Sequence, residues 1–90
     1  MSKTARAEFV VENQLGLHVR AAAMVVRTMT PFVSKVSIWA GTGVADARSV
    51  LDLLTLSASK GTRVVVEAEG DDADTAVATL GDLIARNFAE

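Results

Sequence analysis

The residue type best suited to covalent chemistry in this 90-residue chain is a histidine, and an arginine that could bind an anion stands two positions after it. His18, the only histidine, and Arg20 follow a turn-like stretch (13–16) and stand where an apolar-periodic segment begins. The first turn of a helix presents unpaired backbone N–H groups and a partial positive charge, so it attracts anions. An imidazole held there, with an arginine beside it, is suited to carrying a phosphoryl group. The alternative that these residue types leave open is a histidine that only caps the helix or lies on the surface.

Hydrophobic periodicity predicts the elements that must hold this pair in place. Alternation of apolar and polar residues predicts four strands, at 7–12, 35–40, 44–47 and 62–69. In the first of them, Phe9 and Val11 share one face. A helix is predicted from Val19 to about Thr30, because the residue before Pro31 is pushed out of helical geometry. The apolar stripe of this helix consists of Ala22, Val25, Val26 and Met29.

Two further helices are predicted in the second half of the chain. Ser49 to Asp52 has the S-x-x-D form of a capping box and opens a short helix that runs to about Leu56. Asp71 and Asp72 begin the last helix, where their charges interact favourably with its dipole. The buried stripe of the last helix consists of Ala73, Ala76, Val77, Leu80 and Ile84, with Leu83 beside it.

The predicted order of elements is β-α-β-β-α-β-α, within a single domain that spans residues 1–90. Four strands and three helices indicate an α+β domain with the helices over one face of a sheet. The order of elements does not determine the order of strands, and it fits a ferredoxin-like split βαβ unit equally well. Gly41 to Gly43 lacks the lysine and the helix of a phosphate-binding P-loop, so we interpret it as a hairpin turn.

Composition argues against several classes of function. Half of the residues are apolar and 22% are charged, which is typical of globular proteins. With no cysteine and one histidine, we expect no disulfide and no metal site. No apolar run approaches the roughly 20 residues of a transmembrane helix, and a net charge of −2 argues against wholesale nucleic-acid binding. We therefore expect a cytoplasmic protein with no membrane insertion and no nucleic-acid partner.

Three stretches match motifs that occur together in one bacterial family. Residues 13–20 (N-Q-L-G-L-H-V-R) are similar to a phosphorylation loop written N-x-L-G-L-H-A-R-P-A. Residues 48–54 are similar to a regulatory-serine helix, and Ser59 to Gly61 to the turn before a fourth strand. Together they make the chain resemble the HPr family of histidine phosphocarriers, and its nitrogen-related branch, NPr, fits as well. Alanine stands at position 21, where the motif has proline, and this departure would alter phosphoryl transfer because proline stiffens the first helical turn.

The resemblance implies a fold and a role. The fold is an open-faced sandwich, with three helices on one face of a four-stranded antiparallel sheet. The attacking atom would be Nδ1 of His18, with Gly16 and Leu17 shaping the loop and Arg20 contacting the phosphate. The phosphoryl group would come from phosphorylated enzyme I, itself charged by phosphoenolpyruvate, and pass to an EIIA-type protein in sugar transport or nitrogen-related regulation. The chain would be a monomeric covalent carrier without a cofactor, rather than a stand-alone enzyme.

Ser49 has two interpretations. As a helix N-cap it is fully accounted for by the capping box. The resemblance adds phosphorylation by an HPr kinase/phosphorylase, whose added charge would repel an acidic partner. The alternative function is accordingly a regulatory binding module whose docking is switched by phosphorylation at His18 or Ser49. A structural domain without chemistry leaves the loop motif unexplained.

A docking surface is predicted beside the histidine. Met24 and Arg27 follow Arg20 on the first helix at spacings of four and seven residues, off the apolar stripe. The resemblance adds three apolar contacts from the second helix, Val50, Leu51 and Leu54. An apolar patch rimmed by arginines suits brief docking to acidic partners, a pattern from which Asp52 departs.

The remaining charged and aromatic residues are given simpler roles. Several basic residues fall in the first half of the chain, among them Arg20, Arg27, Lys35 and Arg48. They allow a locally basic face toward an acidic partner despite the negative net charge. We interpret three aromatic residues as packing residues, namely Phe32, Trp39 and Phe88.

Overall fold

The structure, a computed structural model, describes residues 3–89 and is built on a four-stranded sheet. The strands are β1 (Thr4–Val10), β2 (Lys35–Ala40), β3 (Gly43–Asp46) and β4 (Arg63–Glu69). Their order across the sheet is β1-β4-β2-β3, and every neighbouring pair is antiparallel. This strand order was left open by the pattern of elements. The antiparallel pairing of all neighbours confirms the sheet expected of the open-faced sandwich.

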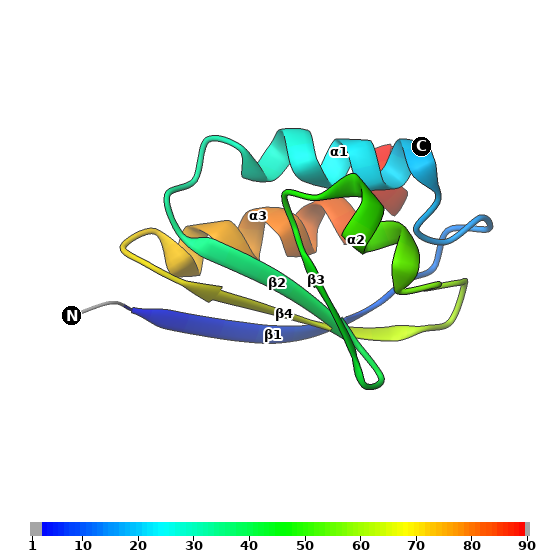
Figure 1. Ribbon diagram of the computed structural model, residues 1–90, viewed down its shortest axis with the longest axis horizontal. Helices are drawn as coiled ribbons and strands as arrows, with labels where there is room; N and C mark the ends of the chain where they lie inside the picture. The colour runs from blue at the N-terminus through cyan, green and yellow to red at the C-terminus, as the bar shows by residue number, and fades with distance from the viewer. Residues whose placement is uncertain (1–2, 90) are drawn as a thin grey trace.

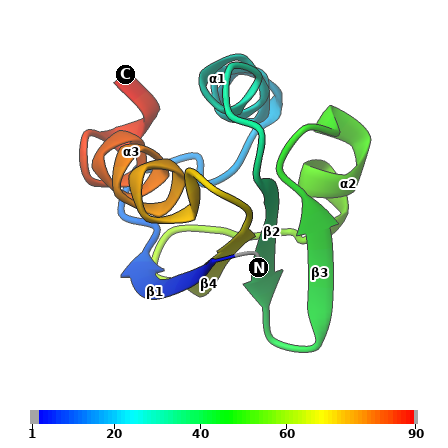
Figure 2. The same cartoon turned by 90° about the vertical axis from the view of Figure 1, so that its left-hand side faces the viewer.

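Three helices lie on one face of the sheet and leave the other face uncovered (Figures 1 and 2). They are α1 (Val19–Met29), α2 (Val50–Thr55) and α3 (Ala73–Ala85). α1 contacts both α2 and α3, and it lies between them when the sheet is viewed end-on (Figure 2). The α+β class and the predicted order of elements are thus confirmed. A short 3-10 turn, η1 (Asn87–Ala89), follows α3 and was not predicted.

The core lies between the helices and the covered face of the sheet, because successive side chains of a strand point to opposite faces. From the two central strands it receives Val36, Ile38, Val64, Val66 and Ala68. From α1 it receives Ala21, Ala22, Val25 and Met29, whereas Val26 is half-buried. α3 buries its whole predicted stripe and also Leu83. Each large aliphatic side chain buried here contributes roughly 1.5–3 kcal/mol, so this layer holds α1 and its first turn in place.

The first strand begins and ends earlier than the predicted range of 7–12. Its pairing with β4 runs from Thr4 opposite Glu69 to Val10 opposite Arg63. Val11 is beyond the ladder, and its side chain is buried on the same side as the half-buried Phe9. The partner strand therefore decides where β1 starts, which alternation within one segment cannot show. The other strand ends lie within one residue of the prediction.

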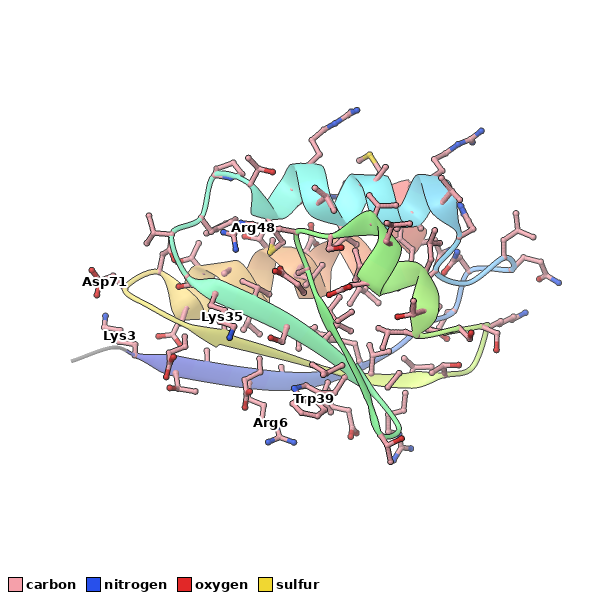
Figure 3. The ribbon with its side chains drawn as sticks, in the orientation of Figure 1. Lys3, Arg6, Lys35, Trp39, Arg48 and Asp71 are labelled. Carbon is pink, nitrogen blue, oxygen red and sulfur yellow. The ribbon has the colours of Figure 1, made fainter. Side chains whose placement is uncertain are left out.

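Trp39 contradicts its interpretation as a packing residue. It lies on the uncovered face of the sheet, 39% exposed and opposite Val44 of β3 (Figure 3). The reason is alternation along β2, which places Trp39 on the same face as Lys35, away from the helices. The other two aromatic residues do pack: Phe88 is buried and Phe32 is half-buried against the core.

Arg48 is turned inward and is not part of a basic face (Figure 3). Its guanidinium donates hydrogen bonds to three carbonyl oxygens near the end of α1, those of Met29, Phe32 and Ser34. Lys35 is also removed from α1, because it lies on the uncovered face of the sheet. The expected basic face therefore reduces to the exposed arginines of α1, Arg20 and Arg27.

Asp72 stands at the N-cap of α3, but its carboxylate makes no capping hydrogen bond to that helix. It accepts instead from the backbone N–H of Val33 at 3.0 Å, and from the N–H and hydroxyl of Ser34 at 2.9 and 2.5 Å. The Ser34 hydroxyl, followed by the Val33 N–H, lowers the pKa of Asp72 below its ordinary value of 3.8. Asp72 thus ties the connection between α1 and β2 to the start of α3.

Asp72→Asn should lower the free energy of unfolding at neutral pH. In the variant, this free energy should also fall less steeply as the pH is lowered. A carboxylate with a lowered folded-state pKa stabilises the protein above its unfolded pKa, and this contribution is lost as pH falls through the folded value. For Asp72 the loss begins near 3.8 and continues below it. Urea unfolding from neutral pH down through this range measures both effects. Asp71→Asn, an exposed change of the same charge, should leave the neutral-pH stability within about 0.5 kcal/mol of the original; equal losses from both variants would refute the role of Asp72.

Candidate functional site

His18 stands at the N-cap of α1, where its backbone is extended (φ −79°, ψ 179°). Its Nδ1 accepts a hydrogen bond from the backbone N–H of Ala21, with 3.3 Å between the two nitrogens. Because Nδ1 is an acceptor, the neutral imidazole carries its proton on Nε2. The half-buried ring thus presents an unprotonated nitrogen to the first turn of the helix.

The first turn of α1 also contains backbone donors that the helix itself does not use. The first bond of the helical ladder runs from the N–H of Ala22 to the carbonyl of His18, at 2.8 Å. The N–H groups of Val19 and Arg20 come before it and have no acceptor within the helix. The Arg20 side chain is exposed in the same turn. A helix dipole favours an anion here by about 0.3–1 kcal/mol, and hydrogen bonds to a charged group add to that.

Gly16 determines the path of the loop that leads to His18. Its φ is +64°, and a Cβ at this position would lie 2.3 Å from the carbonyl oxygen of Ala58. Glycine alone meets both conditions without strain. The side-chain amide of Asn13 donates to the Gly16 carbonyl at 2.7 Å, and the buried Leu17 donates its N–H to the Ala58 carbonyl at 2.8 Å. The loop is therefore fastened to the segment that precedes β4.

The turn at 59–61 lies against the start of this loop. The N–H of Gly61 donates to the carbonyl of Val11 at 2.7 Å. The Lys60 ammonium donates to the side-chain oxygen of Gln14 at 3.5 Å. Two stretches that match family motifs, far apart in the chain, are thus neighbours in space.

Exposed apolar side chains lie on the loop before His18, on α1 and on α2. Leu51 of α2 is 76% exposed, and α2 packs beside α1 (Figure 1). Three further predicted docking residues are half-buried: Met24, Val50 and Leu54. Sequence reasoning missed Leu15 and Val19, which precede and follow His18 in the chain and are 73% and 63% exposed. Their apolar type at positions outside the helical stripe was the available signal, since exposed apolar patches mark interaction sites.

Ser49 caps α2 as the capping box predicts. Its hydroxyl accepts a hydrogen bond from the N–H of Asp52 at 3.2 Å. The return half of the box has a different acceptor, because the Ser49 N–H donates to the carbonyl of Asp46 at 3.0 Å. The Asp52 carboxylate in turn accepts from the N–H of Asp46 at 3.2 Å. Asp52 thus joins the start of α2 to the end of β3, and this explains the acidic residue within the predicted docking surface.

Within residues 3–89, His, Cys, Asp and Glu side chains form no group of three or more that could hold a metal ion. No helix in this part of the chain is long and apolar enough to cross a membrane. A depression lined by Lys35, Trp39 and Glu67 among others lies on the uncovered sheet face, and His18 is not among its lining residues (Figure 3).

Fold and site together define a class of small open-faced sandwich proteins that carry a histidine at the start of a helix. The sequence model of the family described as "PTS HPr component phosphorylation site" matches residues 5–86. The chain therefore belongs to the HPr phosphocarrier family of the phosphotransferase system.

Individual relatives agree with this assignment. The phosphocarrier protein HPr of Xylella fastidiosa is 37% identical over 83 residues, covering 92% of this chain and 93% of that protein. The multiphosphoryl transfer protein of Salmonella typhimurium is 40% identical over 87 residues, which are 93% of this chain but only 23% of that longer protein. The crystal structure of HPr from Thermoanaerobacter tengcongensis superposes with a TM-score of 0.90 at 34% identity, covering 96% of this chain and 97% of that one.

Proposed function

We propose that the protein accepts a phosphoryl group on Nδ1 of His18 from phosphorylated enzyme I and passes it to an EIIA-type protein. In this proposal it acts in the cytoplasm as a monomer, in sugar transport or nitrogen-related regulation. The observation that carries the proposal is the geometry of the N-cap, with an unprotonated Nδ1 held at the positive end of α1. Membership of the HPr family supplies the class of reaction.

The transfer step uses the ring nitrogen as a nucleophile. The lone pair of Nδ1 forms the bond to phosphorus, while the bond from phosphorus to the donor breaks and leaves its electron pair on the donor. The ring retains its Nε2 proton and becomes cationic, next to the phosphoryl group. Onward transfer breaks the Nδ1–P bond and returns the electron pair to the ring. First-turn amides and the exposed Arg20 orient the group, and their modest strength lets it leave again.

Arg27 supports docking of an acidic partner in this proposal. It lies exposed in the last turn of α1, on the helix that carries His18. The apolar residues around the histidine would form the centre of the contact, and Arg20 and Arg27 its charged rim. Rim charges act mainly on the rate of association and on its dependence on salt.

Arg27→Glu should slow phosphoryl transfer from enzyme I by roughly tenfold at low salt, with a smaller effect at high salt. Transfer rates at several salt concentrations measure this. Arg6→Glu is the matched control, because it makes the same charge change on the uncovered sheet face (Figure 3). If both variants transfer at the original rate at low salt, or if both are slowed equally, α1 does not present a basic docking face.

The proposed function is tested by incubating the protein with enzyme I and phosphoenolpyruvate and following its intact mass. We expect one acid-labile, base-stable phosphate, the stability expected of phosphohistidine. Adding an EIIA-type protein should then discharge it. A protein that takes up no phosphate is not a carrier, and a phosphate that no EIIA-type protein removes favours the regulatory module instead.

A second candidate function, a binding module switched at Ser49, is supported by the position of this residue at the head of α2, next to Val50 and the exposed Leu51. A phosphate on Ser49 would lie in the proposed docking surface and add negative charge there. Asp46 and Asp52, which both share hydrogen bonds with the start of α2, would repel it. The local electrostatics therefore favour the carrier over the switch.

Ser49→Ala separates capping from regulation. Loss of the cap should cost about 1 kcal/mol of stability, measured by urea unfolding, while phosphorylation of His18 by enzyme I continues. Ser49→Asn should restore the lost stability, since asparagine caps equally well. An acid-stable, ATP-dependent phosphate added by an HPr kinase and lost in both variants would establish the switch; its absence with the kinase present would dismiss it.

A further inference from the structure

The backbone N–H of Ala21 touches the nitrogen on which the proposed chemistry takes place. It donates to Nδ1 of His18 across 3.3 Å, longer than the usual 2.9–3.0 Å and therefore readily released. Ala21 is the third residue of α1, and the helical ladder begins only at Ala22. The contact depends on the identity of residue 21, because proline, which occupies this place in the motif of the phosphorylation loop, has no N–H.

We propose that Ala21 is a positioning residue whose N–H changes acceptor during each phosphoryl cycle. In the resting protein it donates to Nδ1, and in the phosphorylated protein it donates to an oxygen of the phosphoryl group attached to that nitrogen. This inference rests on the proposed function of His18 and adds to it a residue that holds the group. The buried Ala21 methyl fixes the donor in place, so only the acceptor has to change.

The exchange of acceptors follows from the lone pair of Nδ1. That lone pair accepts the hydrogen bond in the resting state, so it has to leave the Ala21 N–H when it forms the bond to phosphorus. The bond from phosphorus to the donor breaks with its electron pair retained by the donor, and no proton is transferred. The N–H is left facing a group whose oxygens are charged acceptors. The oxygens of a phosphoryl group attached to Nδ1 lie within reach of a donor that was already in contact with this nitrogen.

The hydrogen bond from Ala21 to a phosphoryl oxygen should be stronger than the one to Nδ1, and this difference should affect the phosphoryl equilibrium. Hydrogen bonds to an ionised acceptor are roughly twice as strong as neutral ones, and the resting bond is also long. The Ala21 N–H therefore stabilises the phosphorylated protein more than the resting one. Removing it should shift the phosphoryl equilibrium against this chain by about fivefold, the equivalent of one neutral hydrogen bond.

A competition experiment with Ala21→Pro tests this inference. Equal amounts of the original protein and the variant are mixed with catalytic enzyme I and limiting phosphoenolpyruvate, and intact masses report which of them holds the phosphate. We expect the original protein to hold about fivefold more. Thr75→Pro is the matched control, because Thr75 is the third residue of α3, exposed, and α3 begins at the end of the domain opposite the start of α1 (Figure 1). This control should share the phosphate equally with the original protein.

A second readout does not depend on a folded proline variant. In the original protein labelled with ¹⁵N, phosphorylation should move the Ala21 amide proton downfield and create a scalar coupling between its nitrogen and phosphorus across the hydrogen bond. Equal partition in the competition, or an Ala21 amide without this change, would overturn the inference while leaving the carrier function intact. An original protein that takes up no phosphate would instead overturn the carrier function, and the inference with it.

Discussion

His18→Ala is expected to abolish uptake of phosphate from enzyme I and phosphoenolpyruvate, the largest effect of any single substitution in this protein. The chain contains one histidine, so no other imidazole can replace it. The remaining first-turn donors bind an anion but offer no nucleophile, because amide and guanidinium nitrogens lack an available lone pair. Intact mass after incubation measures the effect, which we expect to be complete rather than partial.

This substitution also removes the side chain that caps α1, so the chemical and structural roles have to be separated. His18→Ala should cost up to about 1 kcal/mol of stability, measured by urea unfolding. His18→Asn is the matched control, because asparagine is among the best N-caps and should restore the helix start. We expect it to fold like the original protein and still take up no phosphate. Acid-labile phosphate on either variant would mean that another residue accepts the phosphoryl group, and this would contradict the proposed function.

Gly16→Ala is expected to weaken both stability and phosphoryl transfer, although residue 16 carries no reactive group. A left-handed φ costs a residue other than glycine about 1–2 kcal/mol, and the new Cβ would lie 2.3 Å from the Ala58 carbonyl oxygen. The carbonyl belongs to the backbone, and a Cβ is fixed by the backbone that bears it. Relief therefore requires the loop to move, which lengthens the hydrogen bond from the Leu17 N–H to the Ala58 carbonyl. His18 follows directly in the chain, and a displacement of about 1 Å can reduce a reaction rate by a factor of 100.

Gly41→Ala isolates the effect of the clash from the effect of backbone conformation. Gly41 has nearly the same φ, +59°, but a Cβ there would meet nothing within 4 Å. Gly41→Ala should lose only the stability that a left-handed φ costs an alanine, and it should transfer phosphate at the original rate. Urea unfolding and single-turnover transfer from enzyme I compare the two variants. If Gly16→Ala behaves like Gly41→Ala in both measurements, contact with Ala58 does not position the histidine.

The site around His18 is built from backbone groups as much as from side chains. The proposed nucleophile is His18, and its environment consists of amide donors, a glycine turn and a carbonyl contact to Ala58. Such groups are held in place by the packing of α1 on the sheet. In the proposed function they would orient a phosphoryl group without binding it so strongly that onward transfer is blocked.

The local features of this protein could be predicted from the sequence. Helix starts at Val19 and Val50, the Ser49 cap and the order of elements all depend on residues within one or two turns of each other. Placing His18 at a helix start needed no more than that, because a turn, a histidine and an apolar period are adjacent in the chain. The ends of β1 were missed because they are determined by β4, more than fifty residues away.

Only the tertiary structure decided which groups meet across the chain. Strand order depends on which strands pair, the exposure of Trp39 on which face of the sheet the helices cover, and the inward turn of Arg48 on carbonyls near the end of α1. The hydrogen bonds from Ser34 to Asp72 and the contact between Gly16 and Ala58 likewise join segments about forty residues apart. By itself, the sequence determined the elements and placed His18 at the start of one of them, because local spacing controls helices and strands. Their mutual arrangement required the fold, because it depends on burial and hydrogen bonds between distant segments that no short-range pattern records.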